Sequence, residues 1–379
     1  MTSASPDGPE KMTVAVGMSG GVDSAAAVLL LKERGYDVIG LTMSIWDSVM
    51  PETVSKKSGC FGPGEVEDIA AARETAGRLG IEHFTVPLAQ EYRQWVLDEF
   101  TKRRLAGYTP NPCAVCNPVM KFGFLLSRAR ESGIRFDRFA TGHYARVARD
   151  GATGLYRLLR GVDKVKDQSY FLARLDQTQL SGLIFPLGDK TKTEARELAC
   201  RAGLEQIAGK SESQDFFEGD DISVLFKSGG AVPGPIIDES GTVLGQHRGI
   251  IYYTVGQREG LGIAVGRKVY VKTIVAETNT LVVAERGGVF SGGCLLSDVR
   301  WVAGEAPDLG RDFTLRLRYR HPGVGAHLES RGVGRFAASF ETPQFAVAPG
   351  QMAVVYDGDE ALGAGWIDRG QGRETGTQL

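Results

Sequence analysis

The sequence lacks long apolar runs and is poor in cysteine, and these two shortages exclude several classes of protein. Its longest apolar run, 25–31, falls well short of the ~18–20 residues that a helix needs to cross a bilayer. The N-terminal segment MTSASPDGPEK lacks the apolar core of a signal peptide. Five cysteines are an odd number that does not suit a secreted disulfide framework. We therefore expect a soluble, cytosolic protein without membrane association, whose cysteines serve redox, metal or catalytic chemistry.

The net charge is also small, at −2, but the charges are unevenly distributed along the chain. Residues 101–172 contain 14 Lys and Arg against 5 Asp and Glu, a net charge of +9, so the rest of the chain carries −11. A basic block within an acidic protein favours a polyanionic partner such as a nucleic acid. A solvated surface segment is the alternative explanation.

The first half of the chain has the pattern of an α/β domain. With 379 residues, of which 42% are hydrophobic, the chain can form more than one domain of the usual ~100–200 residues. Alternating strand and helix patterns predict βαβ units and a parallel sheet, with ligands bound outside the carboxyl ends of its strands. The expected strands are 12–17, 38–43, 81–86 and 136–140, and the expected helices are 25–34, 65–79, 92–105 and 119–130.

The second half has a different texture, with short alternating strands separated by Gly and Pro. Such spacing predicts small β-barrels or sandwiches. The expected strands are 268–276, 280–284, 313–319 and 352–356. The two ends, 1–10 and 369–379, are polar and contain glycine, so we expect them to be disordered tails.

A candidate phosphate-binding loop follows the first expected strand, in the order SGGVDS at 19–24. The adjacent glycines Gly20 and Gly21 permit close backbone approach, and the hydroxyls of Ser19 and Ser24 with the amides of the next helix are suitable donors to a phosphate. Asp23 is an acid within an anion site, which suggests that it holds Mg²⁺ or orients the loop. A plain turn with Asp as a helix cap is the alternative.

A Cys-x-x-Cys pair occurs in TPNPCAVCN, at 109–117. Cys113 and Cys116 could form half of a zinc site, a redox dithiol, or a nucleophile with a helper thiol. No second pair follows at zinc-finger spacing, which counts against a structural zinc ion. The pair lies at a loop-to-helix junction near Lys121, where backbone amides and the lysine are expected to lower a thiol pKa.

Arg316, Arg318 and Arg320 alternate along an expected strand, so we expect them to share one face. With Tyr319 beside them, such a basic stripe suits phosphate contacts and base stacking on single-stranded RNA. A charged edge strand that resists aggregation is the alternative.

Taken together, these segments resemble the tRNA-specific 2-thiouridylases, a family within the N-type ATP pyrophosphatases. The resemblance runs along nearly the whole chain, and it implies a Rossmann-like ATP pyrophosphatase domain with a parallel sheet (11–212), a central linker domain (213–290) and a C-terminal β-barrel (291–368). The matching segments are GMSGGVDS at 17–24, GLTM at 40–43, TPNPCAVCN at 109–117, KFG at 121–123, ATGHYAR at 140–146, KDQSYFL at 166–172, FPLGDKTK at 185–192, ESQDF at 212–216, YTVGQREGLG at 253–262, RYRH at 318–321 and PGQMAVVY at 349–356.

The resemblance also assigns roles to single residues. The implied catalytic residues are Cys116, which handles sulfur, with Cys113 and Asp23. Met43 could equally be a residue that packs in the core, and His143 could be a histidine satisfied by local hydrogen bonds. The implied ATP-binding residues are Gly17, Met18, Ser19, Gly20, Gly21, Val22, Asp23, Ser24, Met43 and Gly142. The implied tRNA-binding residues are Asn111, His143, Lys166, Asp167, Gln168, Arg318, Tyr319 and Gln351.

The chain departs from the family pattern at its second sulfur-handling cysteine, which follows the ESQ segment in relatives. Phe217 stands at that position here. Cys60, after the second strand, is a candidate replacement, and Cys60, Cys113 and Cys116 together could bind a 4Fe–4S cluster. The alternative is that Cys116 alone carries a persulfide, with the other two as resolving thiols or bystanders. Cys200 and Cys294 are expected to be core thiols.

The function implied by the resemblance is ATP-dependent 2-thiolation of the wobble uridine of tRNA. The base is adenylated with the help of Mg²⁺, and sulfur then displaces AMP. The expected partners are tRNA and a sulfur donor, which would be a cysteine desulfurase, a relay protein or sulfide. Two alternatives stay open: a ligase of the pyrophosphatase fold that adenylates a small molecule, and a non-catalytic RNA-binding protein.

Overall fold

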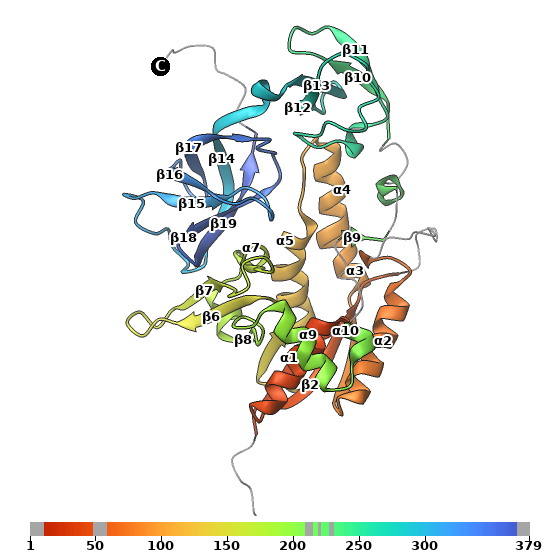
Figure 1. Ribbon diagram of the computed structural model, residues 1–379, viewed down its shortest axis with the longest axis vertical. Coiled ribbons are helices and arrows are strands. Elements are labelled where there is room, and N and C mark those ends of the chain that lie inside the picture. Colours follow the sequence, from red (N-terminus) through yellow and green to blue (C-terminus); the bar gives the residue numbers. More distant parts are fainter. Residues whose placement is uncertain (1–10, 48–58, 209–214, 219–220, 227–230, 370–379) are drawn as a thin grey trace, which may run out of the picture.

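The computed structural model describes residues 11–47, 59–208, 215–218, 221–226 and 231–369. Figure 1 shows three parts: an α/β domain at the lower end, a small β-domain at the upper right and a β-barrel at the upper left. This arrangement confirms the expected fold class. No helix of the described residues is long and apolar enough to span a bilayer. The expected tails at 1–10 and 370–379, and the ESQ segment at 212–214, lie outside the described residues.

The α/β domain is built on a five-stranded parallel sheet in the order β4-β2-β1-β5-β8. Alternation along β1 gives the sheet two buried faces: Val14 and Val16 pack against α1, α2 and α9, whereas Ala15 packs against the helices of the opposite face. All three side chains are fully buried. The bounds are β1 Thr13–Gly17, α1 Val22–Glu33, β2 Asp37–Ser44, α2 Glu65–Arg78, β4 Glu82–Pro87, β5 Arg138–Thr141, β8 Leu183–Ile184, α9 Lys192–Arg201 and α10 Glu205–Ala208.

Strand β1 lies at the point where the strand order reverses, because β2 and β4 lie on one side of it and β5 and β8 on the other. In open α/β sheets, ligands bind at this reversal, outside the carboxyl ends of the strands. The candidate phosphate loop leaves β1 at that place, as the sequence predicted.

Two helical rods cover the second face of the sheet. The first is continuous through α3 (Ala89–Tyr92), the π-helical segment η1 (Arg93–Leu97) and α4 (Asp98–Leu105). The second runs through α5 (Pro112–Cys116), the π-helical segment η2 (Asn117–Phe124) and α6 (Leu125–Glu131). π-Helical turns are rare and frequently occur at functional sites. Here an eight-residue π segment directly follows Cys116.

The central domain has a four-stranded sheet in the order β11-β10-β13-β12. Its turn at Asn279, which has a φ of +48°, joins β12 to β13 as expected. The end of α4 reaches this domain, where the half-buried Arg104 donates from Nη1 to the carbonyl of Tyr253 at 3.1 Å. The bounds are β10 Gly234–Ile237, β11 Val243–His247, η4 Ile250–Tyr252, β12 Val269–Val275 and β13 Thr280–Glu285.

The C-terminal barrel has six strands in the order β14-β17-β16-β15-β18-β19, and β14 pairs with β19 to close it. A hairpin from the first half of the chain, β6–β7, extends the same sheet, since Leu158 of β7 pairs with Ala361 of β19. The sequence did not predict that hairpin in the barrel sheet. The bounds are β6 Ala145–Arg149, β7 Tyr156–Arg160, η5 Arg286–Val289, β14 Phe290–Trp301, β15 Phe313–Arg316, β16 Val324–Ser330, β17 Phe336–Phe345, β18 Met352–Asp357 and β19 Glu360–Asp368.

Candidate active site

The loop between β1 and α1 has the geometry of an anion site. Gly20 has a φ of +70°, and a Cβ there would lie only 3.2 Å from the backbone nitrogen of Ala72 in α2. Gly21 caps α1 without any side-chain hydrogen bond, so the first amides of the helix stay open toward the loop. The hydroxyl of Ser24 donates to the carbonyl of Gly21 at 2.9 Å, whereas Ser19 is exposed. Exposed hydroxyl and open amides together suit a phosphate.

Met18, the first loop residue, is buried and its backbone is held at both polar atoms. Its N–H donates to the carbonyl of Leu41, and its carbonyl accepts from the hydroxyl of Thr42, both at 2.8 Å. Met43, the expected adenine-pocket residue, follows on β2 and is half-buried against the core on the second face of the sheet. The loop and the end of β2 are thus fixed to each other by hydrogen bonds.

Asp23 is held by two residues that the sequence analysis assigned no role. Lys192 of α9 donates to both carboxylate oxygens, at 2.8 and 2.9 Å, and the hydroxyl of Tyr144 donates to Oδ1 at 2.8 Å. Lys192 is buried, and the carboxylate of Asp23 neutralises its charge in an ion pair. Both residues lie in the matching segments ATGHYAR and FPLGDKTK, and their place in these segments was the signal that could have indicated them.

The contact of Asp23 bears on whether this loop fits Mg²⁺. A magnesium ion in a nucleotide site usually takes one or two carboxylates together with phosphate oxygens. Asp23 already accepts three hydrogen bonds from Lys192 and Tyr144. Its carboxylate therefore orients the loop, the second of the two roles expected for it, and does not fit a magnesium ligand in this arrangement.

Gly142 follows β5 and packs directly on the first turn of α1. A Cβ at this position would lie 2.7 Å from the backbone carbon of Asp23, a distance that real structures do not show. Only glycine lets the end of β5 approach the phosphate loop so closely. The structure therefore brings Gly142 and Asp23 together, as the sequence predicted for the ATP site.

The cysteine helix α5 begins at a well-formed cap. Asn111 accepts from the N–H of Ala114 at 3.3 Å, and Pro112 occupies the first helical position. Cys113 and Cys116 are both half-buried. Burial raises the pKa of the Cys116 thiol to about 12, although Lys121 acts in the opposite direction. This corrects the expectation of a lowered thiol pKa: removal of the thiolate from water outweighs the nearby lysine.

Cys60 lies near the two helix cysteines. The thiols of Cys60 and Cys113 both raise the pKa of Cys116. All three thiols also raise the pKa of the buried Tyr92, in addition to the larger effect of its burial. Cys60 is exposed as a residue, but its thiol is partly removed from water, and this burial raises the pKa of the thiol as well. The three thiols thus form one electrostatic cluster.

The strand that carries Cys60 explains how it comes close. β3 (Gly59–Phe61) pairs in parallel with β9 (Asp215–Phe217), so that Phe61 lies opposite Phe217. Phe217 is buried in the core. The position at which relatives carry a second cysteine is therefore filled here by a packed aromatic ring, and Cys60 is on the neighbouring strand.

A 4Fe–4S cluster does not fit this arrangement. Among the described residues, no group of three or more His, Cys, Asp or Glu side chains is placed so that it could hold a metal ion. The cluster expected on Cys60, Cys113 and Cys116 thus has no preformed ligand set. Of the remaining cysteines, Cys294 is half-buried with a pKa raised to about 12 by burial, whereas Cys200 is exposed, which corrects its expected place in the core.

His143 is neutral and packed between two aromatic rings. Burial, and to a smaller extent Lys121, lowers its pKa well below the ordinary range. Its Nδ1 lies 2.7 Å from the hydroxyl of Thr141, and its ring lies about 6 Å from those of Phe122 and Phe185. Lys121 lowers the pKa of both His143 and Cys116, so its cation lies within electrostatic range of both groups.

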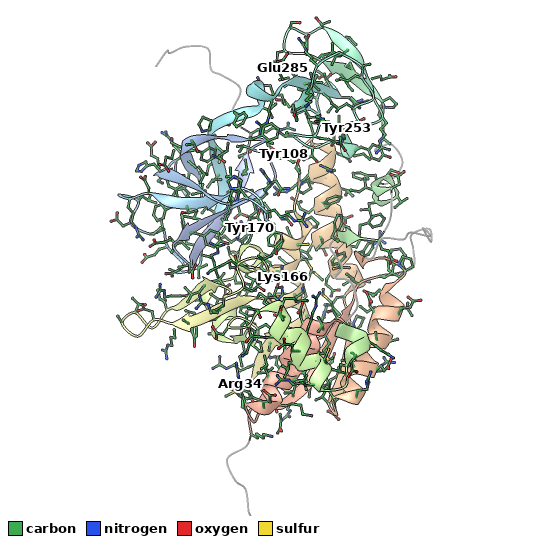
Figure 2. All side chains as sticks on the ribbon, viewed as in Figure 1. Arg34, Tyr108, Lys166, Tyr170, Tyr253 and Glu285 are labelled. Carbon is green, nitrogen blue, oxygen red and sulfur yellow. The ribbon has the colours of Figure 1, made fainter. Side chains whose placement is uncertain are left out.

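Asp167, expected to contact tRNA, is fully buried. It pairs with Arg160 of β7 and Arg316 of β15, each at 3.2 Å, and it accepts from the N–H of Ser169 at 3.1 Å. This corrects the expectation: the carboxylate joins the hairpin and the barrel, because a buried acid needs cationic partners. Its neighbour Gln168 accepts from the N–H of Tyr144 at 3.0 Å, while Lys166 is half-buried near the hairpin (Figure 2).

The arginine stripe is also corrected. β15 ends at Arg316, which is buried and donates to the carbonyl of Tyr319 as well as to Asp167. The ring of Tyr319 packs 4.5 Å from that of Phe171. Only Arg318 and Arg320 are exposed, in the turn after the strand. The basic surface is therefore a turn and not one face of a strand.

The loop before β18 holds the segment that precedes the cysteine helix. Nε2 of Gln351 donates to the carbonyl of Thr109 at 3.0 Å, and the N–H of Thr109 donates to the carbonyl of Pro349 at 2.7 Å. Gly350 has a φ of +90°, and a Cβ there would lie 2.8 Å from the Tyr108 side chain. Gln351 thus fixes the cysteine segment to the barrel.

Glu65, which the sequence analysis missed, fixes the end of β2. The buried carboxylate accepts from the N–H groups of Ile45 and Trp46, at 2.7 and 2.9 Å, and from the hydroxyl of Ser44 at 3.1 Å. Burial still raises its pKa against these hydrogen bonds. No periodicity or motif singled this residue out.

Comparison with known proteins gives three family matches that together extend along most of the chain. Residues 12–217 match the tRNA methyl transferase HUP domain, residues 223–285 match the tRNA methyl transferase PRC-barrel domain, and residues 291–367 match the aminomethyltransferase beta-barrel domain. These three segments correspond to the three parts of Figure 1.

Whole-chain relatives carry a different name from the domain families. A tRNA-specific 2-thiouridylase of Geobacter metallireducens is 43% identical over 94% of this chain and 96% of its own. Another, from Lachnoclostridium phytofermentans, is 41% identical over 93% of this chain and 99% of its own. Among solved structures, a 4-thiouridine synthetase–RNA complex with bound ATP is 18% identical over 55% of this chain and 46% of its own, with a TM-score of 0.31, too low to carry an argument.

Proposed function

Because the chain belongs to the tRNA-specific 2-thiouridylase family, we propose that it activates the wobble uridine of tRNA with ATP and then replaces its C2 oxygen with sulfur. The chain is accordingly an enzyme, a tRNA-uridine 2-sulfurtransferase. The finer steps follow from the geometry around the phosphate loop and the thiol cluster formed by Cys60, Cys113 and Cys116.

The observation that carries this proposal is the packing of the cysteine rod against the end of β5. The ring of Phe122, on the π-helical segment that follows Cys116, lies 5.8 Å from the ring of His143. His143 follows Gly142, which touches the first turn of α1 at Asp23. These contacts join the phosphate loop to the rod that carries Cys116, which a reaction that uses both phosphate and sulfur requires.

In the first step, the C2 carbonyl oxygen of the uridine attacks the α-phosphorus of ATP. An oxygen–phosphorus bond forms and pyrophosphate leaves. The open amides of α1 and the hydroxyl of Ser19 would bind the phosphates, and Lys192 keeps Asp23 from repelling them. Gly142 lets the end of β5 pack against the first turn of α1 beside the loop. The adenylated oxygen is then a good leaving group.

In the second step, a persulfide on Cys116 attacks C2, the carbon–oxygen bond breaks and AMP leaves. The thiolate of Cys113 or Cys60 then attacks the Cys116 sulfur, which forms a disulfide and releases the 2-thiouridine. Hydrosulfide then attacks that disulfide at the Cys116 sulfur, which restores the Cys116 persulfide and frees the partner thiol, so the disulfide is the form of the protein that accepts sulfide. Cys113 and Cys116 are three residues apart on α5 and are therefore neighbours on its surface, which supports such an exchange, since thiol–disulfide exchange needs direct approach of the sulfurs. No step is routed through Mg²⁺ or a cluster, because Asp23 is engaged by Lys192 and Tyr144 and the described residues contain no preformed group of three or more metal ligands.

The test is thiolation of an unmodified tRNA transcript by protein oxidised to its cysteine disulfide, with ATP and sulfide, followed by mass spectrometry of the wobble nucleoside. We expect 2-thiouridine, AMP and pyrophosphate in equal amounts. Cys116→Ser should stop thiolation, with pyrophosphate release as the separate readout of activation, while Cys200→Ser, an exposed cysteine outside the cluster, is the matched control. Pyrophosphate without tRNA but with a small acid or amide would indicate the ligase alternative, and tRNA binding without pyrophosphate would indicate a binding protein.

A further inference from the structure

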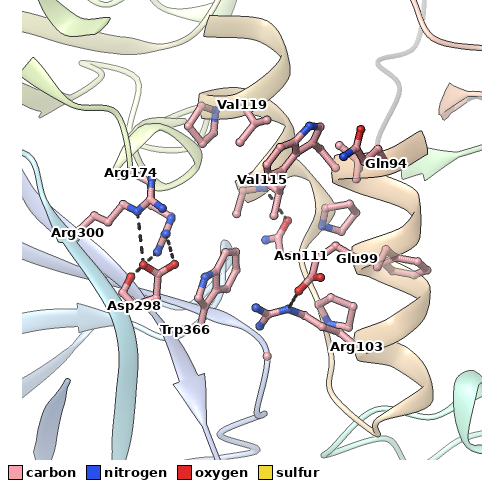
Figure 3. Close-up of a pocket in the computed structure, with 18 residues that line it drawn as sticks. Gln94, Glu99, Arg103, Asn111, Val115, Val119, Arg174, Asp298, Arg300 and Trp366 are labelled. Atoms are coloured by element: carbon pink, nitrogen blue, oxygen red, sulfur yellow. Dashed lines mark hydrogen bonds and ion pairs between the residues drawn. The ribbon is translucent and has the colours of Figure 1, made fainter. Parts of the chain in front are cut away.

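A pocket of about 340 Å³ lies behind the cysteine helix, between the first helical rod and the barrel (Figure 3). Its walls include Val115 and Val119 of the second rod, Trp95 of the first rod and Trp366 of β19. The thiols of Cys113 and Cys116 are not among its lining residues. The pocket is therefore separate from the catalytic cluster but shares the helix that carries it.

We infer that this pocket binds a nucleobase of the anticodon loop other than the uridine that is modified. The inference rests on the proposed tRNA function. Ligand pockets that hold small molecules begin at roughly 300 Å³, so this volume suits one base. Bases that leave the stack of an RNA loop are typically held by an aromatic side chain and by polar groups at their edges.

The pocket offers an aromatic surface that the fold leaves uncovered. Trp95 is 46% exposed, although a large apolar side chain is usually covered. One neighbour on its own side is Phe124, whose ring lies 6.2 Å away and tilted by 42°. Trp366, in contrast, is packed, with Arg103 and Arg174 at 5.4 and 5.0 Å from its ring. Trp95 is thus available for stacking and Trp366 forms a fixed wall.

The polar side of the pocket is formed by a buried, hydrogen-bonded arginine and by an aspartate with a strained backbone conformation. Arg174 is 7% exposed and donates to the carbonyl and to Oδ2 of Asp298, at 2.8 and 2.6 Å. Asp298 has a φ of +45°, a conformation that costs energy in a residue with a side chain and that clusters at functional sites. The pairing of β14 with β19 is irregular at this place, between Ser297 and Arg300. Bulges of this kind re-aim side chains next to binding sites.

The charges favour RNA over a protein partner. Arg103, Arg174 and Arg300 face two carboxylates in the lining, those of Glu99 and Asp298, which leaves a net charge of +1. Arg300 is 61% exposed in its side chain and lies 3.5 Å from Asp298. Arg300 and Asp298 together offer the edge of a base one cationic donor and one acceptor. A phosphate on either side of the base would meet the excess positive charge.

The experiment measures tRNA binding and thiolation, with sulfide as sulfur source, for Trp95→Ala and Arg300→Ala. We expect Trp95→Ala to raise Kd and KM for the transcript by roughly 5- to 100-fold, the loss of one stacked base, with little change in kcat. Trp95→Phe should restore most of the affinity. Arg331→Ala is the matched control for Arg300→Ala, since the side chain of Arg331 is exposed to a similar extent and also pairs with an acid two residues before it.

A second measurement identifies the base. Anticodon stem-loops with a single abasic residue at each loop position are titrated against wild type and Trp95→Ala. At one position, other than the thiolated one, the abasic residue should weaken binding to wild type but cause no further loss of affinity in Trp95→Ala. Fully additive losses at every position would overturn the inference.

The outcomes separate this inference from the proposed function. If wild type fails to thiolate, the proposed function is wrong. If wild type thiolates and Trp95→Ala has unchanged Kd and KM, only the pocket assignment is wrong. If Trp95→Ala retains activity with sulfide but loses it with a sulfur-donor protein, the pocket binds that protein instead of RNA, which also contradicts the inference.

Discussion

At the scale of single residues, Asp23 decides how the phosphate loop works. Its carboxylate neutralises the buried Lys192 and accepts from Tyr144. The loop sequence suggested a metal ligand or an orienting acid, and the tertiary contacts favour the second. A residue of α9, which lies far along the chain, is needed to make that distinction.

We predict that Asp23→Ala lowers pyrophosphate release by at least roughly 10²-fold, the usual cost of losing one electrostatic element of an anion site. The variant leaves the Lys192 cation beside the loop without its partner, which fixes phosphates in the wrong position. tRNA affinity, measured by filter binding, should stay near that of wild type. Thiolation at the full rate would contradict the assignment of this loop to ATP.

The Cys116 thiol gives a prediction on pH. Burial raises its pKa to about 12, so the thiol is protonated at neutral pH in the free protein. We expect alkylation of Cys116 by iodoacetamide to be slow at pH 7 and to rise with pH without a plateau below pH 10. Peptide mass spectrometry, with the exposed Cys200 in the same sample for comparison, measures both rates. A plateau near pH 7 would indicate a lowered pKa instead.

The same shift affects stability with a defined sign. A folded-state pKa raised above the ordinary value favours the protonated thiol, so folding stability is complete below the ordinary thiol pKa and declines as pH rises through it toward 12. Loss of stability on acidification would not come from this group.

Arg318 is the exposed arginine of the turn after β15. We predict that Arg318→Ala weakens tRNA binding and reduces the slope of log Kd against log salt by about one unit, because one phosphate contact is lost. Arg331→Ala, on the β16–β17 turn, is the control. An unchanged slope would show that Arg318 serves only to keep the turn soluble.

At the scale of elements, the approach of β5 to α1 sets the width of the site. Gly142 is required at this approach because a Cβ would meet the backbone of Asp23. Gly20, in the loop itself, is required because of its left-handed φ and its contact with α2. Sequence motifs indicated both glycines, but only the packing shows which neighbours require them.

We therefore predict that Gly142→Ala forces β5 and α1 apart by several tenths of an ångström or more and reduces kcat for thiolation by over tenfold. Misplacement on this scale is costly in a reaction that depends on alignment. Gly151→Ala, in the exposed turn between β6 and β7 with open space around it, should have no effect on rate. Equal rates for both variants would contradict the assignment of Gly142 to the site.

At the scale of the whole molecule, several contacts join the barrel to the α/β domain, and two of them bear on the site. The first is the loop of Gln351, which holds Thr109 ahead of the cysteine helix. The second is the ion network of Asp167 with Arg160 and Arg316, near which Ser169 lies 3.0 Å from the hydroxyl of Tyr356. Figure 2 shows Tyr108 and Tyr170 along this boundary. Docking of the barrel therefore fixes the cysteine segment.

We predict that Arg316→Leu destabilises the folded protein by about 3 kcal/mol, since it leaves the buried Asp167 with one arginine partner fewer. Arg311→Leu, an exposed arginine on the same barrel paired with Asp357, should cost less than ~1 kcal/mol. Thermal unfolding followed by circular dichroism measures both. Equal midpoints for the two variants would contradict a structural role for the network.

The sequence by itself determined the fold class, the glycine loop between the first strand and helix, and the helix start that carries the cysteine pair. Each of these depends on local order: apolar alternation, adjacent glycines after a strand, and a capped helix start at Asn111. Such patterns act over a few residues, and they specify backbone geometry before any distant contact forms. Resemblance to a family added the roles of residues that no local pattern explains.

Only the tertiary structure decided which charges are buried and which thiols meet. Asp167 and Arg316 look like surface residues in sequence, yet the β7–β19 pairing buries them against each other. The pKa of Cys116 depends on how much water the surrounding helices and strands exclude, which sequence spacing does not specify. Burial and electrostatics depend on contacts between residues far apart in the chain, and for that reason they follow from the folded arrangement alone.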